Sequence, residues 1–222
     1  MMEKKVLIIA SHPDDEVLGA GGTILKLIKE ENANVYLCVV TEAVKSLKLS
    51  KEEGIQRRKE VVNSSKMLGI KKTFFLDFQS LLLDTIPIFD IINKLQEIIK
   101  EVNPETVFSH YDNDPNQDHK IVSQASLVAT NPNCSKVKEV YFYEIPSSTT
   151  YSAGFNNFCP NTFVDIEKYI DTKAKILKSY KSEIREYPHP RSMEGVKTYS
   201  QFRGLMCNKN HAEAFILYRR II

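Results

Sequence analysis

The chain has 222 residues, of which 42% are hydrophobic and 26% charged, a composition ordinary for one soluble globular domain. Its net charge of +2 is small and its lysines are scattered, which argues against a nucleic-acid partner. No stretch approaches the roughly 20 apolar residues that span a bilayer, and no signal-peptide pattern precedes the first apolar run. The four cysteines lie far apart, as is typical of free thiols in a reducing compartment, so we expect a cytoplasmic protein without a membrane span.

Strand and helix signals alternate along the first 143 residues. Short β-rich apolar runs predict strands, and apolar residues spaced three and four apart predict helices. The expected strands cover residues 5–10, 35–41, 73–76, 106–110 and 137–143. The expected helices lie around residues 24–28 and over residues 50–68, 87–99 and 117–129.

This succession predicts an α/β fold of the Rossmann-like kind, with a mostly parallel sheet and helices on both faces. After about residue 145 the alternation weakens. There we expect a helix over 166–180, a proline-rich loop at 189–192 and a last strand over 214–218. Because no linker or low-complexity tract interrupts the chain, we expect residues 1–222 to form a single domain. Residues from about 145 onward would be an elaboration of it.

Two clusters of polar residues follow the first and the fourth expected strands. The first is His-Pro-Asp-Asp-Glu at residues 12–16, and the second spans residues 110–119. The carboxyl ends of neighbouring parallel strands meet at one edge of a sheet, where ligands bind in open α/β folds. His12, Asp15 and His119 would there supply two imidazoles and a carboxylate, a set typical of catalytic zinc. The sequence therefore predicts a metal site at the carboxyl edge of the strands.

Three glycines follow the first cluster at positions 19, 21 and 22. They lack the GxGxxG spacing of a phosphate loop, so close packing of the first helix is the favoured explanation. Glu16, at the start of that helix, is interpreted as a partner of the helix dipole.

The first cluster resembles the AHPDDE signature of the PIG-L/LmbE family of zinc-dependent N-deacetylases, with Ser11 in place of the alanine. The second resembles the HPDH signature of that family, here Asn-Gln-Asp-His at residues 116–119. The similarity extends through residues 57–60, 68–69 and 76–78 and covers roughly the first 130 residues at motif level. Residues 144–149, 188–192 and 212–215 more loosely resemble members associated with glycan or nucleotide-sugar biosynthesis.

Carried over residue by residue, the resemblance implies one zinc ion per chain on His12, Asp15 and His119, with Asp14 as the general base. Iron or cobalt would accept the same ligands. It also implies a metal-dependent amidohydrolase that removes an acetyl group from an N-acetylated amino sugar, either a glycan precursor or a nucleotide-linked sugar. Asp14 would take a proton from the attacking zinc-bound water and return it to the departing amine.

One position departs from the family pattern. The family signature begins with a histidine that polarises the carbonyl and is oriented by the following aspartate; here these positions are Asn116 and Asp118. Asp118 would orient Asn116 or a metal ligand, or else only complement the dipole at the start of its helix. An asparagine amide donates a hydrogen bond but cannot be cationic. Either Asn116 suffices as the catalytic donor, or another histidine substitutes, and His110, His189 and His211 all remain open.

Four side chains are candidate substrate contacts: Arg57, His110, His189 and Arg191. Arg57 stands beside two other basic residues and equally fits a solvated helix face. Arg191 lies in the proline-rich loop and is suited either to a substrate phosphate or carboxylate or to packing of the loop.

Two other functions stay open at this stage. Asp112 and Asp114 resemble an acidic motif that holds Mg²⁺ or Mn²⁺ in a glycosyltransferase, although this leaves His12 and His119 unexplained. Asn116 makes a non-catalytic sugar-binding relative the third hypothesis. The sequence also leaves a homo-oligomer open.

Overall fold

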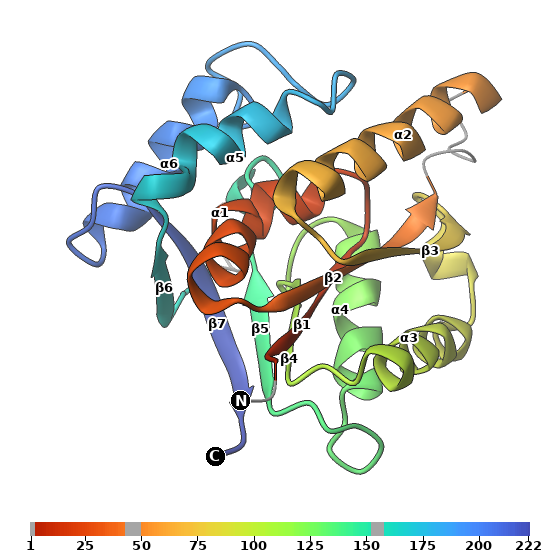
Figure 1. The fold of residues 1–222 in the computed structure, drawn as a ribbon. Helices are drawn as coiled ribbons and strands as arrows, with labels where there is room; N and C mark the ends of the chain where they lie inside the picture. Colours follow the sequence, from red (N-terminus) through yellow and green to blue (C-terminus); the bar gives the residue numbers. More distant parts are fainter. Residues whose placement is uncertain (1–2, 43–49, 152–157) are drawn as a thin grey trace.

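The computed structural model describes residues 3–42, 50–151 and 158–222, and within them seven strands form one sheet in the order β3-β2-β1-β4-β5-β7-β6. Figure 1 shows this sheet with helices on both faces. The strands are β1 (Lys5–Ala10), β2 (Asn34–Glu42), β3 (Lys72–Gln79), β4 (Thr106–His110), β5 (Glu139–Tyr143), β6 (Thr162–Asp165) and β7 (Ala212–Arg220). The predicted α/β fold with a mostly parallel sheet is confirmed.

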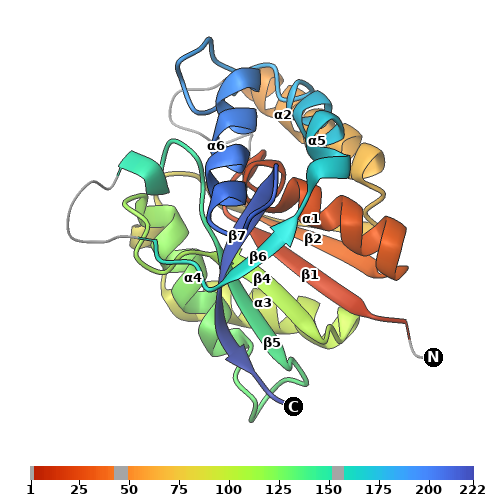
Figure 2. The ribbon, with the colours of Figure 1, turned by 90° about the vertical axis from the view of Figure 1, so that its left-hand side faces the viewer.

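The helices divide between the two faces of the sheet, as the two views in Figures 1 and 2 show. One apolar core lies beneath α1, α2, α5 and α6, and a second lies beneath α3 and α4. Their bounds are α1 (Asp15–Glu31), α2 (Lys51–Leu68), α3 (Ile88–Val102), α4 (Gln117–Ala129), α5 (Ile170–Leu177) and α6 (Met193–Leu205). Short 3-10 turns lie at η1 (Leu83–Thr85), η2 (Thr149–Tyr151) and η3 (Glu167–Tyr169).

Strand β1 lies at the centre of the parallel part of the sheet. It pairs with β2 on one side and with β4 on the other, both in parallel. The chain therefore winds outward from β1 in two opposite directions, and the crevice for a ligand in such a sheet opens at this switch point. The loops that leave β1 and β4 are the two that carry the polar clusters of the sequence.

The sequence signals locate the first 143 residues well and the tail less well. Helix α2 begins with the predicted capping box of Ser50 and Glu53 and ends at Gly69, whose φ of 86° is left-handed. The helix expected over 166–180 is shorter, consisting of η3 and α5. Strand β6 and helix α6 were not predicted at all, because four half-buried residues and a helix with few periodic apolar positions give weak patterns.

The tail extends the same sheet, since β7 pairs antiparallel with β5 and with β6. Glu213 on β7 accepts hydrogen bonds from the backbone N–H groups of Gly22 and Thr23 in α1, at 2.8 and 2.7 Å. The same carboxylate pairs with the buried ammonium of Lys173 on α5 at 2.7 Å. This shared sheet and buried ion pair support the single-domain prediction, which remains our proposal.

Close packing explains the glycines of α1, as predicted. A Cβ on Gly22 would lie 2.7 and 2.8 Å from two side-chain carbons of buried Ile166, whereas the nearest contacts for Gly21 are 3.3 Å. We expect Gly22→Ala to lower the free energy of unfolding by about 1–2 kcal/mol, because overpacking costs more than the gain in helix propensity. Urea denaturation of this variant and of Gly21→Ala tests it, and equal stability of the two variants would contradict it.

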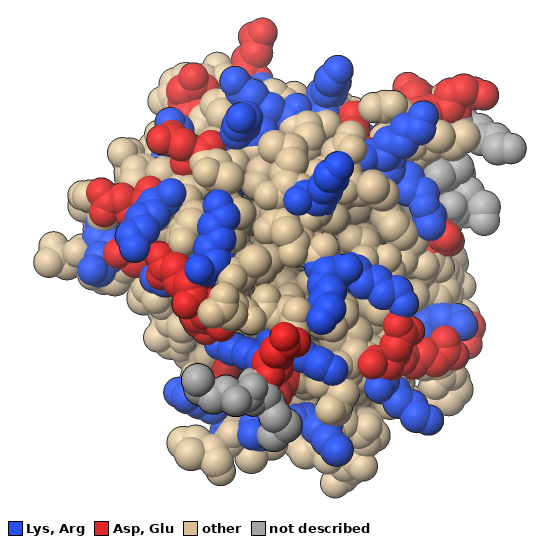
Figure 3. All heavy atoms as spheres, viewed as in Figure 1, with Lys and Arg blue, Asp and Glu red and all other residues tan. Residues whose placement is uncertain are grey.

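Basic and acidic side chains are interspersed on the face shown in Figure 3. Within the part of the chain that the structure describes, no helix has the length and apolar character required to cross a bilayer.

Candidate metal centre

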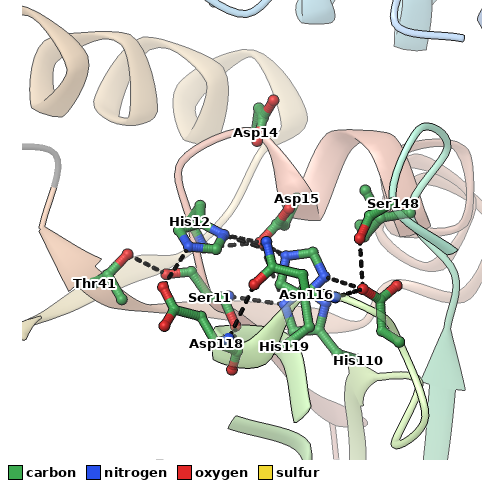
Figure 4. Close-up of polar contacts among 12 residues, drawn as sticks. Ser11, His12, Asp14, Asp15, Thr41, His110, Asn116, Asp118, His119 and Ser148 are labelled. Atoms are coloured by element: carbon green, nitrogen blue, oxygen red, sulfur yellow. Dashed lines mark hydrogen bonds and ion pairs between the residues drawn. The ribbon is translucent and has the colours of Figure 1, made fainter. Parts of the chain in front are cut away.

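The two polar clusters meet at the carboxyl edge of β1 and β4. Figure 4 shows His12 and Asp15, which follow β1, facing His119 from the start of α4. Within the described residues, these three form the one group of potential metal ligands whose donor atoms all lie within 4.8 Å of one another. Asp15 and His119 are buried, and the His12 side chain is 18% exposed.

The three donor atoms form a nearly equilateral triangle. His12 Nδ1 lies 3.2 Å from His119 Nε2 and 3.4 Å from Asp15 Oδ2, and the third edge, from His119 Nε2 to Asp15 Oδ2, is 3.5 Å. Donors bound at about 2.0–2.1 Å to a tetrahedral zinc ion are separated by about 3.3–3.4 Å. The spacing, the nitrogen and oxygen donor types and the burial therefore fit a zinc ion.

A carboxylate orients each of the two histidines from behind. Asp118 Oδ2 lies 2.8 Å from His12 Nε2, and Asp114 Oδ1 lies 3.1 Å from His119 Nδ1. With those outer nitrogens donating to carboxylates, the inner nitrogens present lone pairs to each other and to Asp15. Three electron-rich atoms at such distances repel unless a cation lies between them.

An unpartnered oxygen of Asp15 and the raised pKa of His12 also indicate that this centre favours a cation. Asp15 Oδ1 is buried without a hydrogen-bond partner among the described residues. Burial lowers the pKa of His12, but its hydrogen bonds to Asp118 and Asp15 outweigh this and raise the pKa to about 10. The centre thus favours positive charge where the triangle lies.

We expect Asp118→Asn to weaken zinc binding by about 10–100-fold, because the orienting carboxylate of His12 is lost. Competition with a chelating dye measures this affinity. Asp112→Asn, at an exposed aspartate of the same loop, serves as the control. Equal affinities of the two variants would contradict the orienting role.

Within the described residues, Asp112 and Asp114 of the glycosyltransferase hypothesis belong to no group of potential metal ligands. Asp112 is exposed, whereas Asp114 is buried. The Asp114 carboxylate is engaged by His119 and by the hydroxyl groups of Ser148 and Thr149. These hydrogen bonds lower the pKa of Asp114 to about 2, although burial opposes them. The geometry therefore does not support the glycosyltransferase interpretation.

His110 lies on the buried side of the candidate metal centre. It is fully buried, and its ring stacks on that of His119 with centroids 4.0 Å apart. Its Nε2 accepts the backbone N–H of Ser11 at 2.8 Å. Burial, together with the charge of His119, lowers the pKa of His110 to about 4. His110 thus packs against the centre, with its Nε2 3.3 Å from Asp15 Oδ2, and the substrate contact predicted for it stays a prediction.

Asn116 contacts the backbone of Asp118, whereas the Asp118 carboxylate follows the other predicted alternative and contacts a metal-ligand candidate. The Asn116 side chain accepts the backbone N–H of Asp118 at 2.9 Å and so caps the N-terminus of α4. The carboxylate of Asp118 instead binds His12 and the backbone N–H groups of Leu81 and Leu83. Asp118 is therefore placed to orient His12, not the Asn116 amide.

Asp14 has a left-handed backbone, with φ 98°, and its buried carboxylate turns away from the triangle in Figure 4. It pairs with Arg191, whose Nη1 lies 3.1 Å from Asp14 Oδ2. Burial raises the pKa of Asp14 well above its usual value, and the Arg191 charge opposes this. Glu183 binds both Arg191 and Arg57, which brings the two predicted arginines together beside Asp14.

The remaining predicted residues lie around this region. His189 is half-buried in the loop of Arg191, and its Nδ1 accepts the Arg191 backbone N–H at 3.1 Å. Glu16 is buried, with Tyr180 Oη at 2.5 Å and Ser64 Oγ at 3.0 Å from its Oε1. It thus joins α1, α2 and the segment after α5, beyond the dipole role suggested for it.

Sequence reasoning missed Glu183 and the orienting role of Asp114. Glu183 lies in a lysine- and glutamate-rich stretch where one more carboxylate gives no signal. Asp114 was singled out only for the glycosyltransferase hypothesis. Its position five residues before His119 was the available signal, because a metal-bound histidine commonly has a carboxylate partner.

Comparison with known proteins gives consistent matches. The family described as "PIG-L: GlcNAc-PI de-N-acetylase" matches residues 7–130. The "uncharacterized deacetylase YaiS" of Escherichia coli (strain K12) is 32% identical over 189 residues, covering 81% of this chain and 91% of that protein. The diacetylchitobiose deacetylase of Thermococcus kodakarensis is 26% identical, covering 95% of this chain and 81% of that one.

A solved structure shares the fold across nearly the whole chain. It is the N,N'-diacetylchitobiose deacetylase of Pyrococcus horikoshii in complex with an inhibitor, at a TM-score of 0.78 and 25% identity. The match covers 98% of this chain and 85% of that one.

Proposed function

Because this chain belongs to the PIG-L family, described as GlcNAc-PI de-N-acetylase, we propose that it is a zinc-dependent hydrolase of N-acetylated amino sugars. The relatives are named deacetylases, which confirms the predicted class of enzyme. The substrate would be a glycan precursor or a nucleotide-linked sugar that loses its acetyl group. The names of the chitobiose deacetylases among the relatives and solved structures support a sugar substrate.

The observation that carries this proposal is the triangle of His12 Nδ1, Asp15 Oδ2 and His119 Nε2. Its edges of 3.2–3.5 Å match the donor spacing around tetrahedral zinc. We propose one zinc ion per chain, with iron and cobalt as alternatives for the same donors. When bound, such a cation supplies Lewis acidity that acidifies a water molecule and polarises an amide carbonyl.

The side chains around the triangle would transfer the proton and hold the two histidine ligands in place. Asp14, next in sequence to a ligand but separate from the triangle, would accept the proton of the attacking water and pass it to the leaving amine. Asp118 and Asp114 would hold His12 and His119 in the orientations that present their inner nitrogens. Arg191 would fix the position of the Asp14 carboxylate.

We propose that Arg57, His189 and Arg191 contact the substrate beside Asp14. Within the described residues, the side-chain amide nitrogen of Asn116 has no hydrogen-bond partner, so it is available to donate to the carbonyl oxygen. Of the other histidines, we favour His189 as an assisting group. His110 is buried, and His211 is hydrogen-bonded to Ser200 on α6 at 2.8 Å.

Metal analysis of the purified protein, combined with acetate release from a panel of N-acetyl sugars and nucleotide-sugars, tests the proposal. We expect about one zinc ion per chain, acetate from at least one panel member, and loss of activity on chelation that zinc restores. Protein that binds no divalent metal and releases no acetate would refute it.

Asn116→His separates an active enzyme from a non-catalytic relative. We expect the wild type to be active and the variant to turn over faster, because histidine can be a charged donor to the oxyanion. Loss of the helix cap is expected to cost about 1 kcal/mol of stability, which thermal unfolding measures. Absence of turnover in both proteins would favour the non-catalytic alternative.

We propose that the enzyme is cytoplasmic. Whether it forms a homo-oligomer can be measured by light scattering of the purified protein.

A further inference from the structure

Two arginines beside the proposed catalytic centre bind one carboxylate. Arg57 on α2 contacts Glu183 Oε1, and Arg191 Nη1 lies 2.8 Å from Glu183 Oε2. Arg191 Nη1 also lies 3.1 Å from Asp14 Oδ2. We refer to Asp14, Arg57, Glu183 and Arg191 as the arginine–carboxylate cluster. Its members come from the loop after β1, from α2 and from the segment between α5 and α6.

The cluster carries no net charge when all four groups are ionised. Each guanidinium faces a carboxylate oxygen of the protein, and Glu183 occupies the position between the two arginines that an anionic substrate group would otherwise take. The Glu183 and Arg191 side chains are only 13% and 21% exposed, so solvent screens these charges weakly. A phosphate or carboxylate that enters here finds both guanidinium charges already neutralised and is repelled by the two neighbouring carboxylates.

The cluster keeps hydrogen-bonding capacity in spite of its neutralised charge. Arg57 Nε is buried and has no hydrogen-bond partner among the described residues. Arg191 Nε is held by Ser147 Oγ at 2.8 Å, while no described group bonds its Nη2. Donors without net charge suit uncharged acceptors, such as the hydroxyl and acetamide oxygens of a sugar.

We propose that Glu183 makes this site select neutral N-acetylated sugars over sugars that carry a phosphate or a carboxylate. This inference rests on the proposed deacetylase function and narrows its substrate class to uncharged glycan units. Glu183 acts here through Arg57 and Arg191 as a specificity-determining residue. It is not a member of the proposed catalytic set.

The test compares one sugar in two charge states. For the wild type, Glu183→Gln, Glu183→Asp and the control Glu186→Gln, kcat/KM for acetate release is measured with the methyl glycoside of N-acetylglucosamine and with N-acetylglucosamine 1-phosphate. Glu186 is exposed in the same segment, so its variant makes the same change in net charge away from the arginines.

We expect the wild type to prefer the neutral glycoside. In Glu183→Gln the ratio of kcat/KM for the phosphate to that for the glycoside should rise at least tenfold, equivalent to about 1.4 kcal/mol. Glu183→Asp keeps the charge and should stay near the wild-type ratio, as should Glu186→Gln. Because the readout is a ratio within one protein, a general loss of stability or activity does not imitate it.

A wild type that prefers the phosphate, or an unchanged ratio in Glu183→Gln, would overturn the inference while leaving the deacetylase function intact. If Glu183→Gln does not fold, the wild-type preference alone decides, because a wild type that favours the phosphate overturns the inference and one that favours the glycoside supports it. Failure of the proposed function is recognised separately, as absence of acetate from every neutral and charged sugar in the wild-type panel.

Discussion

Replacing Asp14 with asparagine is expected to lower kcat for acetate release by about 10²–10⁴-fold, the usual contribution of a general acid–base group. The asparagine has nearly the same size and keeps an oxygen for Arg191, which lies 3.1 Å from Asp14 Oδ2. It cannot accept a proton from water. Because Asp14 contributes no atom to the donor triangle, the zinc content of Asp14→Asn should stay close to that of the wild type.

Steady-state kinetics and metal analysis of the same preparation check this prediction together. Asp90→Asn, at an exposed aspartate on α3, makes the same chemical change far from the centre and should leave both quantities unaltered. A tenfold or smaller loss in Asp14→Asn would assign the proton transfer to another group. His189, in the loop of Arg191, would be the first to examine.

Replacing His119 with alanine is expected to remove both the metal and the activity. Two of the three edges of the donor triangle end at His119 Nε2, so two donors remain. We expect zinc content to fall below about one tenth per chain and acetate release to fall at least about a thousandfold, since metal-derived stabilisation of the transition state amounts to several kcal/mol.

The control for this variant is His211→Ala. His211 is hydrogen-bonded to Ser200 on α6 and is not part of the donor triangle. It should retain metal and activity. Normal zinc content in His119→Ala would mean that the metal is held elsewhere in the chain.

The sequence was sufficient for the parallel part of the fold and for the convergence of the three donors. Apolar runs and helical spacing located β1, β2, β4 and the helices between them, because each buries a regular face. The strand order then follows from few choices, and the polar loops after β1 and β4 must meet at one edge. Two histidines and an aspartate in those loops made His12, Asp15 and His119 predictable as neighbours.

The contacts behind the donors could not be predicted, because they depend on small differences in direction within one loop. Asp112, Asp114 and Asp118 lie close together in the sequence, yet one is exposed and the other two bind different histidines. His110 is the last residue of the fully buried strand β4, and a run buried on both faces does not show by side-chain alternation which way each residue points. Such assignments need the three-dimensional positions.

In the tail the strand expected over 214–218 is confirmed as part of β7, whereas β6 and α6 escaped prediction for a different reason. The stability of the tail depends on long-range contacts, such as the ion pair of Lys173 with Glu213 and the hydrogen bonds of Glu213 to α1. Neither has a local signature. Glu183 likewise acquires its importance only when the segment after α5 is placed across α2 and the loop after β1.

Whether His12, Asp15 and His119 together hold a zinc ion can be seen by anomalous diffraction at the zinc edge, from crystals grown with zinc at about one equivalent per chain. We expect one strong peak per chain, about 2.0–2.2 Å from His12 Nδ1, from an Asp15 carboxylate oxygen and from His119 Nε2. A metal peak at other residues, or no peak between these three atoms in protein that releases acetate, would contradict this expectation.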